Sequence, residues 1–217
     1  MIRRLLEALF ASALYGFSIG AVHSLQLASW NLFKFPLLII LTGGICGVAY
    51  YVFALFITDR LTFRDVVQHA LTIYRDISIL LASLSPVSLF LAKTIVQPHD
   101  KDLNEYPFFL GLNVFFIAAC GTVALIRRAS DLLNNCNVER RQSVLIILSW
   151  LAISLFAGGQ CAWYLRPYFG VSTIKDIPFI EGSRPDYRGA RSFYEAVYHL
   201  MDPPPLPDDY RNYLQGH

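Results

Sequence analysis

Long uncharged stretches recur along the chain, and short polar segments separate them. No Asp, Glu, Lys or Arg occurs within residues 8–33, 35–57, 77–92, 107–126 and 142–165. A helix that crosses the hydrocarbon layer of a bilayer, which is about 30 Å thick, needs about 20 predominantly apolar residues. The pattern therefore predicts five transmembrane helices, over residues 6–26, 35–57, 77–96, 107–126 and 143–165.

Polar residues and prolines predict how these helices are joined. We expect a short turn over residues 28–34, followed by a helix with Pro36 in its first turn, where a missing N–H costs nothing. Residues 58–76 place apolar and charged positions at helical spacing, which predicts an amphipathic helix at the membrane surface. Pro86 predicts a kink in the third helix. The alternative for the first helix is that it lies in the interface instead of crossing.

Composition agrees with this fold class. Of the 217 residues, 55% are hydrophobic and 16% are charged, whereas about 25% are charged in soluble proteins. We therefore expect an all-α integral membrane protein whose first partner is the lipid bilayer. The net charge of +2 is too small and too dispersed to indicate a nucleic-acid partner.

Basic residues predict the orientation of the chain. The N-terminus and the second and fourth interhelical segments carry nine arginines, against three lysines on the opposite side. The nine are Arg3, Arg4, Arg60, Arg64, Arg75, Arg127, Arg128, Arg140 and Arg141, and the three are Lys34, Lys93 and Lys101. Because basic residues accumulate on the cytoplasmic side, we expect a cytoplasmic N-terminus and an extracytoplasmic C-terminal tail.

Small residues recur at four-residue steps in three of the predicted helices. They are Ser12, Gly16, Gly20 and Ser24 in the first, Gly43 and Gly47 in the second, and Ser154, Gly158 and Ala162 in the fifth. Such stripes let helix backbones approach closely in lipid. They predict helix packing, either among the helices of this chain or against another subunit.

The polar tail, residues 170–217, contains one amphipathic segment near residues 190–201. Its apolar positions are Phe193, Tyr194, Val197, Tyr198 and Leu200, which predict a short helix that docks on the membrane or on a partner. Four prolines among residues 203–207 favour an extended conformation directly after it.

Chemistry-bearing motifs are absent from the sequence. It contains no HExxH, GxSxG, Walker-type glycine loop or Cys/His cluster, so we expect no catalytic residues, no metal and no cofactor. His23 is the one histidine inside a predicted span, and ion or proton pathways normally need ionisable groups there.

Several short motifs carry a resemblance. They are Ala13-Leu14-Tyr15-Gly16, Lys34-Phe35-Pro36, the run from Gln160 to Gly170, and Phe193-Tyr194-Glu195-Ala196-Val197. In these the chain resembles a group of small bacterial membrane proteins, which is loosely similar to the five-helix Yip family. The resemblance implies a bacterial inner membrane and multiple spans, and it implies no activity or binding residue.

Two functions fit these observations. The first is a non-catalytic accessory or scaffolding subunit that packs against other integral membrane subunits, because packing stripes are present and catalytic motifs are not. The alternative is a channel or transporter for a small solute, either as one chain or as a homo-oligomer, because pore walls can be built from small and hydroxyl residues.

Overall fold

The structure is a computed structural model that describes residues 2–21, 24–95, 105–168, 179–180 and 192–201, and within these residues it is all-helical. The helices are α1 (Ile2–Gly20), α2 (Leu25–Leu55), α3 (Phe63–Ile95), α4 (Glu105–Asn135), α5 (Arg140–Tyr164) and α6 (Phe193–Met201). The expected all-α fold is confirmed.

Four helices are long and apolar enough to cross a membrane, namely α2, α3, α4 and α5. The expectation of a multi-pass membrane protein is therefore confirmed. The remaining expected span, the first one at residues 6–26, corresponds to α1, which has 19 residues, carries Arg3 and Arg4 in its first turn and is not among the four. The count of five spans is not confirmed.

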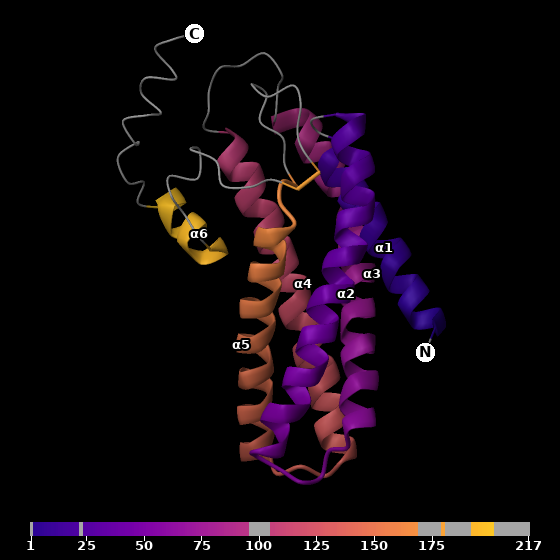
Figure 1. Ribbon diagram of the computed structural model, residues 1–217, viewed down its shortest axis with the longest axis vertical. Coiled ribbons are helices and arrows are strands. Elements are labelled where there is room, and N and C mark those ends of the chain that lie inside the picture. The colour runs from indigo at the N-terminus through magenta and orange to yellow at the C-terminus, as the bar shows by residue number, and fades with distance from the viewer. Residues whose placement is uncertain (1, 22–23, 96–104, 169–178, 181–191, 202–217) are drawn as a thin grey trace.

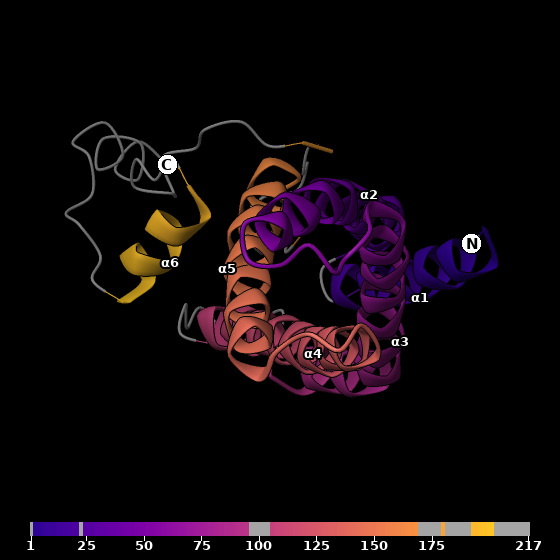
Figure 2. The same cartoon turned by 90° about the horizontal axis from the view of Figure 1, so that it is seen from below.

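The helices α2, α3, α4 and α5 form a ring in which each packs against its two neighbours, and α1 lies against both α2 and α3 (Figure 2). The α2–α3 and α4–α5 connections lie together at one end of the bundle, which we name the lower end as it is drawn in Figure 1. Helix α1 starts partway along the bundle and ends near its upper end (Figure 1).

The expected turn over residues 28–34 is wrong, because these residues belong to α2. The Ser24 hydroxyl accepts a hydrogen bond from Leu27 N and caps the helix, and Pro36 lies inside it. The polar residues that suggested a turn, Asn31 and Lys34, are fully buried instead of solvated. Their partners, Pro167 and Tyr168, come from the segment after α5, so no local pattern reveals them.

Helix α3 contains both the expected interfacial helix and the expected third span, and the first was expected to lead directly into the second. Thr62 Oγ1 accepts a hydrogen bond from Asp65 N at the start of α3, and Pro86 lies inside the helix. The merger has a simple reason: no glycine or proline separates residues 58–76 from the apolar run that follows. With 33 residues, α3 is the longest helix described, at about 50 Å.

Two apolar clusters form the core. The lower core is built from α2, α3, α4 and α5 around Tyr50 and Trp150, whose rings stack with centroids 4.6 Å apart. The upper cluster joins α1, α2 and α3 through Tyr15, Phe35 and Leu81. Burial of large side chains therefore ties all five long helices together.

Candidate functional site

The small residues of α1 pack directly on α2. A Cβ atom added to Gly16 would lie 2.4 Å from Asn31 O, and one added to Gly20 would lie 2.6 Å from Ala28 Cα. Real Cβ atoms do not approach backbone atoms so closely, so only glycine allows this helix contact. Ser12 is buried on the same helix, whereas Ser24 lies beyond α1 as the cap of α2.

The small residues of α2 and α5 lie at looser contacts. A Cβ added to Gly43 would lie 3.2 Å from Tyr74 Cδ2, and Gly47 and Gly158 have ordinary van der Waals distances to their neighbours. Ser154 Oγ donates a hydrogen bond to Trp150 O and also bonds the Tyr50 hydroxyl, whereas Ala162 is half-buried. The predicted set is thus distributed over three helix contacts and does not converge on one site.

The tail helix α6 contacts α5. The Tyr194 hydroxyl donates to Leu155 O, and its ring stacks on Phe156 with centroids 6.4 Å apart. A Cβ on Gly159 would lie 2.9 Å from Phe193, so this glycine, which the sequence did not single out, makes room for α6. Tyr198 is 59% exposed, and the side chains of Val197 and Leu200 lie outside the described residues.

A lysine clamp joins α2 to the segment after α5. Lys34 is fully buried, and its Nζ donates to Pro167 O at 2.7 Å among the rings of Trp30, Tyr168 and Phe179, whose centroids lie 5.1–6.0 Å away. Such ring faces stabilise a buried cation. Asn31 Nδ2 donates to Tyr168 O at 2.6 Å, which fixes the same segment. The clamp therefore holds the start of the C-terminal region against α2.

A second buried polar group links α1, α3 and α4. The Tyr15 hydroxyl and Ser88 Oγ both donate to Asn113 Oδ1, at 3.0 and 2.9 Å, and Asn113 Nδ2 donates to Phe109 O at 2.8 Å. All polar atoms of the amide side chain are engaged, and the three residues are buried. Hydrogen bonds of this kind hold helices together where no water is present.

Ion pairs connect α1 to α3 and α3 to α4. Arg75 Nε lies 2.7 Å from Glu7 Oε2, and Arg128 Nε lies 2.5 Å from Asp76 Oδ2. The neighbouring Arg4 donates to Thr72 Oγ1 at 3.1 Å. Sequence reasoning missed these pairs because the partners are more than 50 residues apart. The available signal was Glu7, a carboxylate at the start of an otherwise uncharged run.

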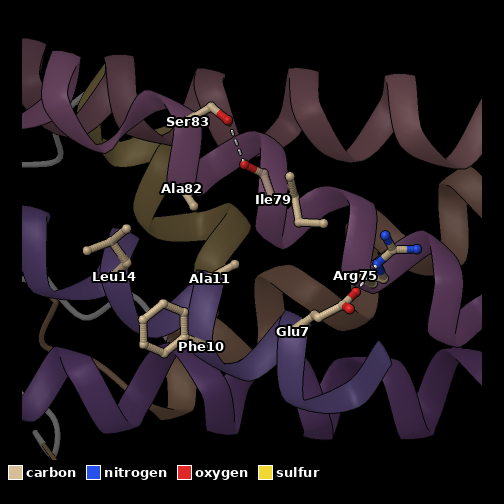
Figure 3. A pocket seen from close by; sticks show the side chains of 8 residues that line it. All are labelled: Glu7, Phe10, Ala11, Leu14, Arg75, Ile79, Ala82 and Ser83. Atoms are coloured by element: carbon tan, nitrogen blue, oxygen red, sulfur yellow. Dashed lines mark hydrogen bonds and ion pairs between the residues drawn. The ribbon is translucent and has the colours of Figure 1, made fainter. Parts of the chain in front are cut away.

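An open groove of about 560 Å³ runs between α1 and α3 beside one of these ion pairs. Figure 3 shows Glu7 and Arg75 at one end and apolar side chains along the rest, among them Phe10 and Leu14 of α1 and Ile79 of α3. The groove is therefore charged at one end, apolar along its length, and open to the surroundings of the bundle.

The outer surface of the lower end is apolar on one side of the bundle and mainly polar on the other. On α2 and α5 it exposes large apolar side chains, which we name the α2–α5 lower face: Val48, Val52, Phe53, Val144, Leu145 and Leu148. On α3 and α4, apart from the exposed Phe63 at the start of α3, it exposes mainly polar side chains, which we name the α3–α4 lower face: Arg64, Gln68, Arg127 and Asp131.

Both lower faces lie at the same level of the bundle. The rings of Tyr51 on α2 and Phe63 on α3 are 5.2 Å apart, and Gln142 Nε2 on α5 donates to Ile57 O at 3.0 Å. Tyr74, next to the ion pair of Arg75, contacts Gly43 of α2, so the ion pairs lie opposite the interior of the apolar run 35–57. The charged and the apolar halves therefore stand side by side.

No protein-family model, no curated protein and no solved structure was found to match this chain. The resemblance to small bacterial membrane proteins therefore stays a prediction, and the function is argued from the geometry.

Proposed function

We propose that this chain is a non-catalytic accessory or scaffolding subunit of a larger membrane protein complex. The observation that carries the proposal is the contrast between the α2–α5 lower face and the α3–α4 lower face. On each side of a bilayer the hydrocarbon ends at one level. The α2–α5 lower face fits hydrocarbon, whereas the α3–α4 lower face fits water, although both faces lie at the same level of the bundle.

Lipid alone satisfies only one of the two faces. If the hydrocarbon boundary lies at Arg75 and Asp76, the α2–α5 lower face stands outside the hydrocarbon with its apolar side chains in water. If the boundary lies at Ile57, then charged residues such as Arg127 and Asp131 are placed in hydrocarbon, which costs several kcal/mol for each charge. A protein partner removes this conflict by covering one face.

Tilting the bundle does not remove the conflict. From Gly43, opposite the ion pairs, to Ile57 is 14 residues, or about 21 Å along α2 at 1.5 Å per residue. The two faces lie on opposite sides of two packed helix layers and are therefore about 20 Å apart, so levelling this offset needs a tilt of about 45°. Transmembrane helices tilt by at most about 40°. We therefore place the partner on the α2–α5 lower face, with the boundary at the ion pairs.

Substitutions on this face test the proposal. We expect mild-detergent extraction to give a stoichiometric complex with other membrane polypeptides, and Phe53→Gln with Leu148→Gln to lose that partner while remaining folded. Phe115→Gln, on an exposed phenylalanine of α4 well away from the lower end, is the matched control and should retain the partner. A monodisperse, partner-free chain in several gentle detergents and in nanodiscs would exclude the proposal.

We also propose that the chain resides in a bacterial inner membrane with its lower end in the cytoplasm. The support is the bias of nine arginines against three lysines, since Arg60, Arg64, Arg140 and Arg141 flank the two connections at that end. Cys136 lies at the α4–α5 connection and reports the orientation. An impermeant thiol reagent should not label it in intact cells and should label it in inverted membrane vesicles, and the reverse pattern contradicts this orientation.

The solute-path alternative has less support from the geometry. Large side chains of the lower core, with Tyr50, Trp150 and Leu133 at 0% exposure, fill the space between the four ring helices. A path through the middle of one chain would have to displace them. A scaffolding role does not require these core side chains to move.

A further inference from the structure

We propose that the groove between α1 and α3 binds an anionic phospholipid from the surrounding bilayer, with its headgroup at Arg3, Arg4 and Arg75 and one acyl chain along the groove. This inference is independent of the protein partner proposed above, because it concerns a different face of the bundle.

The walls of the groove fit an acyl chain. Phe10, Leu14 and Ile79 line it with apolar surface, while the small side chains of Ala11 and Ala82 leave the space between the two helices open (Figure 3). Ser83 also lines the groove, but its hydroxyl donates to Ile79 O at 3.0 Å and is already satisfied. The surface offered to a ligand is therefore almost entirely hydrocarbon.

The charges at one end fit an anionic headgroup. Arg3 and Arg75 both pair with one carboxylate, Glu7, and Arg4 bonds the neighbouring Thr72, so the three arginines and Glu7 carry a net charge of +2. The side chain of Arg3 is 93% exposed, and Figure 3 shows the terminal nitrogens of Arg75 directed away from Glu7. Basic clusters at helix ends on the cytoplasmic side are typical headgroup sites. A zwitterionic headgroup supplies no net charge to balance them.

The dimensions agree with one leaflet. From Glu7 to Leu14 the groove follows seven residues of α1, or about 10 Å. Half of the hydrocarbon core is about 15 Å thick, so the groove holds most of the depth that one chain occupies. Because the groove opens outward, a lipid can enter sideways from the bilayer without any opening of the bundle.

The test is native mass spectrometry of the full-length protein released from nanodiscs that contain equal amounts of dioleoyl phosphatidylglycerol and dioleoyl phosphatidylcholine. We expect retained phosphatidylglycerol to exceed phosphatidylcholine severalfold. Arg75→Gln and Arg4→Gln should each reduce that preference by about fivefold, as expected for the loss of one arginine near an anionic headgroup. The double variant Arg140→Gln/Arg141→Gln removes two arginines from the start of α5 and should leave the preference unchanged.

Glu7→Gln separates lipid binding from a purely structural ion pair. Removing this carboxylate leaves the three arginines without their competing anion, so phosphatidylglycerol retention should rise, whereas Arg75→Gln lowers it. A pair that only holds α1 to α3 would give both variants the same direction of change. Equal changes in the two variants, equal retention of both lipids, or an equal loss in the Arg140→Gln/Arg141→Gln control would each overturn the proposal. If the wild-type chain purifies without any protein partner but keeps its preference for phosphatidylglycerol, only the scaffolding proposal is refuted.

Discussion

The lower core and the upper contact of α1 hold helices together in different ways. In the lower core, Trp150 and Tyr50 stack face to face, and Trp150 Nε1 donates to Tyr50 O at 3.1 Å, so large side chains fill the distance between helices. In the upper contact, Gly16 and Gly20 have no side chain, so the backbone of α1 lies directly against the backbone of α2 at Asn31 and Ala28.

This difference predicts opposite sensitivities. Where large side chains fill the interior, removing volume leaves a cavity that the surrounding helices close only in part. Where backbones touch, adding volume forces the helices apart, and in lipid that separation forfeits the close contacts on which association depends. The lower core should therefore suffer most from truncation, and the upper contact from enlargement.

The largest expected effect is from Trp150→Ala in the lower core. Trp150 is fully buried among α2, α4 and α5, so its loss should lower the free energy of unfolding by about 3–5 kcal/mol. Leu148→Ala is the matched control on the same helix, because Leu148 is 57% exposed, and it should change stability by no more than about 0.5 kcal/mol. Unfolding in detergent micelles measures both, and similar values for the two variants would refute the packing role of the indole.

Next in size is Gly16→Leu in the upper contact. The new side chain meets Asn31 O and the ring of Phe35, and since Asn31 O is a backbone atom we expect a loss of about 1–3 kcal/mol with α1 displaced from α2. Gly44→Leu is the control, because a Cβ there meets nothing within 4 Å. Thermal stability followed by size-exclusion chromatography should separate the two. If Gly44→Leu is equally harmful, the cause is not the α1–α2 contact.

The sequence predicted what depends on local composition. The apolar runs 35–57, 107–126 and 143–165 all lie in helices that can cross a membrane, because hydrophobicity over about 20 residues is a local property. The helical state of residues 28–34, where a turn was expected, was not predictable in this way. In the sequence Lys34 indicates a polar break in the helix. Its burial is possible because Pro167 O, 133 residues later in the chain, accepts its hydrogen bond.

The groove between α1 and α3 was hidden for the same reason. Glu7 and Arg75 each look like an interfacial charge in their own segment, and only the packing of α1 on α3 makes them partners. The sequence also did not show which helix packs against the small residues of α1, because a stripe of small residues allows close packing without identifying the neighbouring helix. For Gly16 and Gly20 that helix is α2 of the same chain.

Asn113→Leu should have a smaller effect, and it sharpens the comparison by removing hydrogen bonds with little change in volume. The variant leaves the hydroxyls of Tyr15 and Ser88 without their shared acceptor, which should cost about 1 kcal/mol. A double-mutant cycle with Ser88→Ala isolates the coupling. Additive losses would mean that the Ser88–Asn113 hydrogen bond contributes no measurable coupling energy.

The smallest effect concerns Cys136, which packs against the lower core at the α4–α5 connection. Burial raises the pKa of its thiol, and the negative charge of Asp65 raises that pKa further. The thiol form is therefore favoured in the folded state, so this contribution to stability is complete below the ordinary thiol pKa and disappears as the pH rises through the raised value.

Alkylation needs the thiolate, so in a variant with Cys46, Cys120 and Cys161 replaced by alanine the rate should level off at a higher pH than for an ordinary cysteine. The same variant unfolded in sodium dodecyl sulfate is the control and should show the ordinary profile. Identical profiles in the two states would mean that the connection leaves Cys136 open to water, and that the lower core ends before it.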